Sequence, residues 1–216
     1  MKKLKKQEQS ESWGQWILQV LILTAIFFGI FFVLNKYVFA NFPVSGISMQ
    51  RTSENNDCVI ALRPSKIKEG DIVIVDAPDE PGALYIKRVI GLPGDTIVSK
   101  NNQIYINGKK LNQPWLKAGQ KLIDNGEDGI SGTKYTNTQN FTLSSLAKTQ
   151  NYRQFYTSKQ LKEMQKTNKV PANTYFVMGD HRSVSKDSRY IGTIPRSKIV
   201  GVVKMRYWPL NHITFY

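Results

Sequence analysis

Serines, lysines and two histidines are the side chains that could do chemistry in this sequence. His181 and His212 stand alone, without the carboxylate–histidine spacing of a metalloprotease, so we expect no metal and no cofactor. A Ser-His-Asp triad through His181 is formally available, but its charged neighbours favour a polar loop residue. His212 is interpreted as a turn residue. The single cysteine, Cys58, heads an apolar run and is interpreted as a small core residue.

Serine catalysis without histidine requires another base, and lysine is the remaining choice. A serine hydroxyl is a poor nucleophile until its proton is removed. Lysine can remove it only if its pKa falls from about 10.4 to about 7.5, a change worth roughly 4 kcal/mol. Burial among apolar groups can supply that change. The base should therefore lie within an apolar strand.

Lys87 meets this requirement. Residues 84–90 form an apolar run in which period-two alternation places Tyr85, Lys87 and Val89 on one face. Arg88, on the other face, stays protonated and cannot act as the base. The alternative interpretation of Lys87 is an edge-strand lysine that discourages aggregation.

Ser48 is the candidate nucleophile. Gly46 lies two residues earlier. Without a side chain, its backbone could approach a substrate closely or adopt a positive φ. The alternative is a flexible loop. Another serine–lysine pair, Ser145 and Lys148, fits the S-x-x-K pattern of penicillin-recognising enzymes, but the S-D-N and K-T-G partner motifs are missing.

A polar, densely charged cluster occupies residues 179–189. Four of its charged side chains can pair with one another, which predicts a structural role for Asp180, Arg182, Asp187 and Arg189. Ser185, in the same cluster, could hydrogen-bond to a lysine and orient it.

The elements that must position these residues are short strands separated by turn residues. Strands are predicted at 58–62, 71–76, 84–90, 96–99, 103–106, 109–111, 174–178, 199–207 and 213–216. Residues 112–170 are rich in Asn, Gln, Lys, Ser and Thr, which indicates an insertion or subdomain with short helices at 144–148 and 158–166. The predicted fold class is mainly β, an antiparallel-sheet catalytic domain with a smaller inserted subdomain, preceded by one N-terminal transmembrane helix.

Residues 17–34 carry no formal charge and would span roughly 27 Å as a helix, close to the thickness of a bilayer core. Aromatic residues flank this stretch, and four lysines precede it. The positive-inside rule then puts the N-terminus in the cytoplasm and the following domain outside. A cleaved signal ending at Ala40 is the competing interpretation, but the stretch exceeds the usual length of a signal h-region. A buried core helix is disfavoured because no polar face exists.

The charge balance restricts the partners. The chain has 30 basic and 16 acidic residues, a net charge of +14. This excess favours anionic lipid headgroups or acidic cell-wall polymer. Nucleic acid is not expected, because no groove-reading motif, zinc spacing or single-strand-binding aromatic motif is found.

Together these segments resemble the type I signal peptidase family, the membrane-bound serine–lysine proteases that remove signal peptides. Four segments in order carry the resemblance behind a single span of the Gram-positive-like form. They are residues 45–49 (nucleophile box), 69–75 (strand box), 85–95 (lysine box) and 178–189 (last box).

The resemblance implies roles position by position. Ser48 would attack the scissile carbonyl, and its N–H would be one oxyanion-hole donor; Lys87 would take the serine proton and later activate water. The supporting residues implied are Ser185, which would orient Lys87, and Asp187, Arg189 and Arg88, which would brace the site.

Three positions depart from the family pattern. Arg51 replaces a proline, so the turn after Ser48 could be looser. Gly46 replaces a serine whose hydroxyl helps fill the oxyanion hole in some members, which leaves the second donor open. His181 replaces an asparagine.

The resemblance implies a single-pass cell-membrane serine endopeptidase that needs no cofactor. Residues 1–15 would be a short basic cytoplasmic tail, 16–40 the signal-anchor helix, and 41–216 the extracytoplasmic peptidase domain, with 112–170 inserted. Its partners would be signal peptides of exported preproteins, the lipid bilayer and the secretion machinery. The alternatives are an inactive relative acting as a membrane-bound assembly or binding factor, a self-cleaving repressor-type protease, and a non-enzymatic envelope protein.

Overall fold

A computed structural model describes residues 13–50, 52–116 and 138–216. Arg51, whose effect on the turn after Ser48 was in question, and the lysines of the predicted tail lie outside the described residues. The chain divides into two compact units, Met1–Phe39 and Ala40–Tyr216. Each unit is described by itself.

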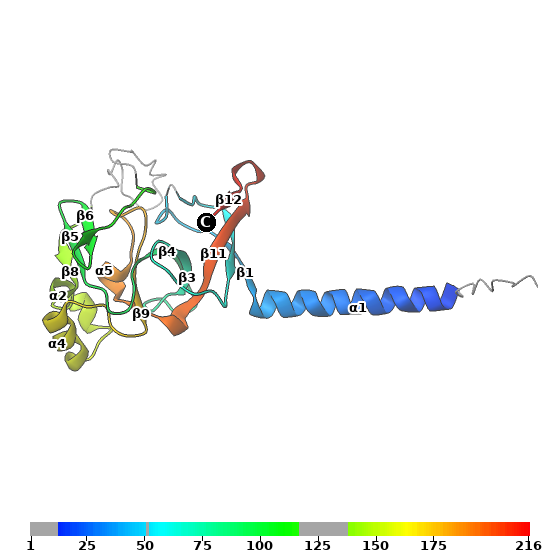
Figure 1. Ribbon diagram of the computed structural model, residues 1–216, viewed down its shortest axis with the longest axis horizontal. Helices are drawn as coiled ribbons and strands as arrows, with labels where there is room; N and C mark the ends of the chain where they lie inside the picture. Colours follow the sequence, from blue (N-terminus) through cyan, green and yellow to red (C-terminus); the bar gives the residue numbers. More distant parts are fainter. Residues whose placement is uncertain (1–12, 51, 117–137) are drawn as a thin grey trace, which may run out of the picture. The chain divides into compact units, whose positions relative to one another are not determined.

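The first unit is built on a single long helix, α1 (Trp13–Tyr37), drawn in blue in Figure 1. Its 25 residues are apolar on every side and none is buried within the protein. Thr24 and Asn35, two of its few polar residues, hydrogen-bond to backbone carbonyls one turn earlier, so their polar groups are satisfied inside the helix. Length and composition together are those of a membrane-spanning helix.

The second unit contains a large sheet whose long strands pair with their neighbours in antiparallel fashion. Its strands run in the order β1-β2-β11-β3-β4-β9-β10, and β12 pairs with β11. The bounds are β1 Phe39–Pro43, β2 Cys58–Leu62, β3 Ile72–Asp76, β4 Leu84–Gly91, β9 Thr174–Met178, β10 Ile194–Pro195, β11 Ile199–Trp208 and β12 Thr214–Phe215. The mainly β, antiparallel fold class with an N-terminal apolar helix is therefore confirmed.

A smaller antiparallel sheet has the order β7-β6-β5-β8. Its strands are β5 Ile97–Lys100, β6 Gln103–Ile106, β7 Lys109–Lys110 and β8 Phe141–Thr142. Figure 1 shows α2 (Leu143–Leu146) and α4 (Ser158–Thr167) beside this sheet, and α3 (Gln150–Arg153) lies between them in the chain. The segment 112–170 thus contains β8, which joins the small sheet, and the three helices α2, α3 and α4. The small sheet itself begins earlier, at Ile97.

The remaining short elements lie next to β9 and β11 in the chain. Helix α5 (Ser188–Ile191) comes after β9, and two 3-10 turns, η1 (Arg196–Lys198) and η2 (Leu210–His212), flank β11. His212 lies in the second turn and is exposed, as predicted.

The large sheet is covered on both faces, and this gives β4 its burial. On β3, Ile72 and Ile74 belong to one apolar cluster, while Val73 and Val75 belong to another on the opposite face. Because Val73 pairs with Lys87 on β4, the lysine faces the same side as the valines. A charged residue at the centre of β4 is therefore withdrawn from solvent by its neighbours.

Candidate active site

Lys87 and Ser48 meet within the Ala40–Tyr216 unit although 39 residues separate them in the chain. Lys87 Nζ donates a hydrogen bond to Ser48 Oγ at 2.8 Å. The lysine is only 4% exposed, and Tyr85, on the same face of β4, presents its ring 5.2 Å from Nζ. An amine at this distance from a hydroxyl can exchange a proton with it directly.

Burial lowers the pKa of Lys87 to about 8. The Asp187 carboxylate acts in the opposite direction and raises this pKa, while the Arg189 guanidinium lowers it. Because burial is the largest influence, a substantial fraction of the amine is neutral close to physiological pH. This is the electrostatic condition that a lysine base requires.

The chain turns tightly at Ser48. Gln50 N–H donates to Ile47 O at 3.1 Å, and the buried side chains of Ile47 and Met49 hold the turn from either side of the serine. Within the part of the chain that the structure describes, the Ser48 N–H makes no hydrogen bond. It therefore remains available to an incoming oxygen.

Gly46 precedes this turn with a φ of +89°, a conformation that favours glycine. Its N–H donates to Asn55 Oδ1 at 3.0 Å and so does not serve the reaction centre. A Cβ built at Gly46 would meet no atom within 4 Å. The backbone conformation, rather than a lack of space, therefore favours glycine at this position.

Arg88 and Asp180 form a buried ion pair behind the nucleophile turn. Arg88 Nη2 lies 2.6 Å from Asp180 Oδ2, and Arg88 Nε donates to Asp180 Oδ1 at 2.9 Å. The Thr52 hydroxyl donates to the same carboxylate at 2.5 Å, and the Trp115 ring stacks on the guanidinium. Asp180 was expected to pair within its own segment; its ion-pair partner is instead on β4.

Asp187 and Arg189 form a second buried pair, 2.8 Å apart, at the start of α5. Asp187 caps this helix by accepting from the Arg189 N–H, and it also accepts from Gly179 N–H at 3.0 Å. The pair therefore fastens the two ends of the polar cluster to each other. An ion pair within this cluster was expected, and these two residues form one.

Ser185 lies beside the nucleophile. Gly179 fits between them, because a Cβ on Gly179 would lie 2.2 Å from Ser185 Oγ and 2.4 Å from Ser48 O. Ser185 is buried, and its hydroxyl has no hydrogen-bond partner among the described residues. The expected bond from Ser185 to Lys87 is thus not formed in this structure, and its orienting role stays a prediction.

His181 lies in a loop, as the sequence predicts, but it is not on the surface. It is 1% exposed and contacts the nucleophile turn. Its N–H donates to Ser48 O at 3.0 Å, and its ring Nδ1 lies 3.2 Å from Ile47 O. The charged neighbours concealed this placement, because their own charges are compensated by buried partners.

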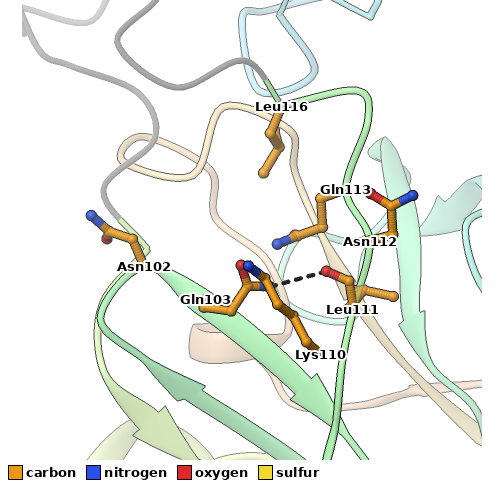
Figure 2. Close-up of a pocket in the computed structure, with 7 residues that line it drawn as sticks. All are labelled: Asn102, Gln103, Lys110, Leu111, Asn112, Gln113 and Leu116. Atoms are coloured by element: carbon orange, nitrogen blue, oxygen red, sulfur yellow. Dashed lines mark hydrogen bonds between the residues drawn. The ribbon is translucent and has the colours of Figure 1, made fainter.

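Arg182 is also fully buried, and burial lowers its pKa to about 10. Its guanidinium donates to Gly179 O, to Thr138 Oγ1 and, at 2.6 Å, to Gln113 Oε1. Gln113 also borders a cavity of about 470 Å³, drawn in Figure 2, in which Gln103 Nε2 donates to Leu111 O. The lining residues of this cavity are Asn102, Gln103, Lys110, Leu111, Asn112, Gln113 and Leu116, and none of them belongs to the serine–lysine pair.

The family described as signal peptidase, peptidase S26, matches residues 13–208 of the chain. The chain belongs to this family. It is 32% identical to signal peptidase IB of Staphylococcus aureus (strain MRSA252) over 203 residues, covering 92% of this chain and 93% of that protein. It is 33% identical to signal peptidase I of Bacillus caldolyticus over 215 residues, covering 97% of both.

A crystal structure of a signal peptidase I from Enterococcus faecalis V583 is similar to the chain at 31% identity. It covers 64% of this chain and 97% of that one, with a TM-score of 0.45. Membership of the S26 signal peptidases makes the chain a serine endopeptidase.

Proposed function

We propose that this chain is a membrane-anchored signal peptidase in which Ser48 is the nucleophile and Lys87 its general base. The observation that carries the proposal is the 2.8 Å hydrogen bond between Lys87 Nζ and Ser48 Oγ at a buried position. The lowered pKa of Lys87 supports it, because only the neutral amine can take the serine proton.

The reaction follows from this geometry in two halves. Neutral Lys87 removes the Ser48 hydroxyl proton as Oγ attacks the scissile carbonyl, and the resulting ammonium then protonates the departing amine. This leaves the signal peptide as an ester on Ser48 and releases the mature chain. In the second half, neutral Lys87 takes a proton from water as the water oxygen attacks the ester. The resulting ammonium returns this proton to Ser48 Oγ as the signal peptide leaves with a carboxylate end.

The Ser48 N–H donates to the oxyanion that develops in both halves. Asp187, Arg189 and Arg88 support the site indirectly, since their ion pairs fix the polar cluster and the back of the nucleophile turn. Ser185, buried beside Gly179, is the residue that would orient Lys87.

The substrate is an extended peptide that adds to the free edge of β4. Strand β9 pairs with Arg88, Val89 and Gly91 only, so among the described strands residues 84–87 have a partner on one side alone. Backbone hydrogen bonds along such an edge recognise a peptide with little regard to sequence. This edge ends at Lys87, where the scissile bond would be presented.

Helix α1 anchors the enzyme in the cell membrane as a single span, with residues 1–15 in the cytoplasm and 41–216 outside. The apolar helix and the lysines before it support this orientation, and the basic remainder suits anionic headgroups. Its partners are signal peptides of exported preproteins and, through them, the secretion machinery.

A cysteine test checks the orientation. Because Cys58 is the single cysteine, a Lys110→Cys variant on a Cys58→Ser background carries one exposed thiol on β7. A membrane-impermeant maleimide should label it in intact cells. Labelling only after lysis would contradict the orientation.

The catalytic assignment is tested with a purified preprotein and the full-length enzyme in detergent. Ser48→Ala should remove cleavage, whereas Ser145→Ala, in the unused S-x-x-K pattern, should leave it unchanged. A serine-directed covalent inhibitor should form one adduct per chain on the wild type and none on Ser48→Ala. Full cleavage by Ser48→Ala would eliminate the serine mechanism, and a wild type that neither cleaves nor forms the adduct would favour the inactive assembly factor.

A further inference from the structure

The peptide bond between Ile47 and Ser48 carries the proposed oxyanion donor. A trans peptide is planar, so its C=O and its N–H point in opposite directions from the same rigid unit. Whatever holds the Ile47 carbonyl therefore sets the direction of the Ser48 N–H. Among the described residues two groups hold it, the Gln50 N–H at 3.1 Å within the turn and the His181 ring at 3.2 Å.

His181 grips the nucleophile turn through both its ring and its backbone. Its Nδ1 faces Ile47 O, and its N–H donates to Ser48 O at 3.0 Å. A carbonyl oxygen can only accept, so the Nδ1 atom must carry the proton. The two carbonyls that flank the serine nitrogen and carbon are thus both fixed by one residue.

His181 is itself held rigidly. It is 1% exposed, and its own carbonyl accepts from Val184 N–H at 3.3 Å and from Ser185 N–H at 3.0 Å. The preceding residue, Asp180, is fixed by the buried ion pair with Arg88. The ring is therefore a stationary donor rather than an adaptable surface group.

We propose that His181 is a positioning residue for the oxyanion hole, aiming and polarising the Ile47–Ser48 peptide through its Nδ1–H. A hydrogen bond accepted by a peptide carbonyl strengthens the N–H of the same peptide as a donor. The effect matters more here because Gly46 has no hydroxyl to supply a second donor. The inference rests on Ser48 being the nucleophile, as proposed above.

The test compares two substitutions at His181 in full-length enzyme. His181→Leu keeps an apolar side chain of similar size but removes the donor, whereas His181→Asn keeps an N–H attached at Cγ, the position that Nδ1 occupies. We expect His181→Leu to lower kcat roughly 10- to 100-fold, below the full effect of deleting an oxyanion donor, with KM within about twofold. We expect His181→Asn to recover kcat to within a fewfold of wild type.

A matched control is Ser99→Ala in the small sheet, which also removes one buried bond to a backbone carbonyl, that of Gln139. It should lower the melting temperature comparably while leaving kcat unchanged. A peptide boronic acid, which forms a tetrahedral adduct on the serine, should bind His181→Leu at least tenfold more weakly than wild type. A signal peptide with a C-terminal amide, which forms no tetrahedral adduct and carries no anionic oxygen at its end, should bind both equally.

If His181→Leu does not fold, the proposal can still be tested on the wild type, by finding which ring nitrogen of His181 carries the proton. Only His181 and His212 occur in the chain, so ¹⁵N spectra of histidine-labelled enzyme can be assigned with a His212→Gln variant. A protonated Nδ1 on His181 supports the proposal, and a bare Nδ1 overturns it. An unchanged kcat in His181→Leu, or no recovery of kcat in His181→Asn, also overturns the proposal for His181, provided that Ser48→Ala is inactive. Cleavage by Ser48→Ala would instead refute the proposed function.

Discussion

Lys87 and Arg88 are adjacent on β4, are both almost fully buried and point to opposite faces, yet the fold treats their charges differently. Arg88 faces a carboxylate that accepts three hydrogen bonds from it, all within 3.2 Å. Lys87 faces a neutral hydroxyl, and burial lowers its pKa to about 8. The Asp180 carboxylate stabilises the charged form of Arg88. No carboxylate bonds to Lys87 in the same way, so burial favours its neutral form, which can act as a base.

Replacing Lys87 by arginine, the cation found next to it on β4, should have the largest effect on cleavage. Lys87→Arg keeps the positive charge and most of the length but supplies no base, because guanidinium stays protonated. We expect kcat/KM for preprotein cleavage to fall roughly 10³-fold or more. Cleavage within tenfold of wild type would show that the proton leaves by another route.

Removing the carboxylate that pairs with Arg88 should mainly lower the stability of the fold. Asp180→Asn leaves the Arg88 guanidinium buried without its carboxylate, which should cost about 3–5 kcal/mol in the free energy of unfolding. Chemical denaturation of the full-length enzyme in detergent measures this loss. The control is Asp76→Asn, whose ion pair with Lys198 is largely exposed and should contribute less than about 1 kcal/mol.

Removing the uncompensated charge should stabilise the fold while it destroys activity. Lys87→Met should raise the free energy of unfolding by about 3 kcal/mol at pH 7, since wild type bears the cost of a buried ammonium there. The unfolded chain binds more protons than the native one between the native pKa of about 8 and the ordinary value of 10.5, so wild-type stability rises with pH across that window. The advantage of Lys87→Met should therefore narrow above pH 8, and equal stabilities at pH 7 would refute the explanation.

The mildest test uses the wild-type enzyme and follows kcat/KM as a function of pH. Because the neutral amine is the reactive form, kcat/KM should rise about tenfold per pH unit below pH 8 and level off above it. Tyr85, beside the lysine, has its pKa raised to about 12 by burial and nearby carboxylates, so it does not titrate in this range. A profile that is flat between pH 6 and pH 8 would contradict lysine as the base.

Much of the sheet could be predicted from the sequence, because its strands are short apolar runs between turn residues. Cys58–Leu62, Gln103–Ile106 and Thr174–Met178 have the predicted bounds. The alternation in β4 correctly placed Tyr85 and Val89 together on one face, in a shared apolar cluster.

The short strands β1, β8 and β10 were not predicted. Phe39–Pro43 contains Asn and Pro, and the other two are only two residues long, so local propensity gives no signal for them. They are strands because a neighbour pairs with them, and pairing between distant segments is invisible to a local pattern.

The candidate site divides in the same way. The apolar setting of Lys87 is local and could be predicted, and Ser48 followed from the family resemblance. The partner of Asp180 lies 92 residues away on β4, and His181 becomes a core residue only when the nucleophile turn packs over it. Polar sequence around both concealed these contacts, since a compensated charge and a solvated one look alike in a sequence.

Arg182 joins segments that are distant in the chain. Its guanidinium donates to Gly179 O in its own segment, to Thr138 Oγ1 and to Gln113 Oε1, which lies 69 residues earlier. The fixed fork of five N–H donors lets one side chain reach all three acceptors, whereas a lysine would offer a single rotating group. The polar cluster beside Ser48 is therefore tied, through one residue, to the border of the cavity in the small sheet.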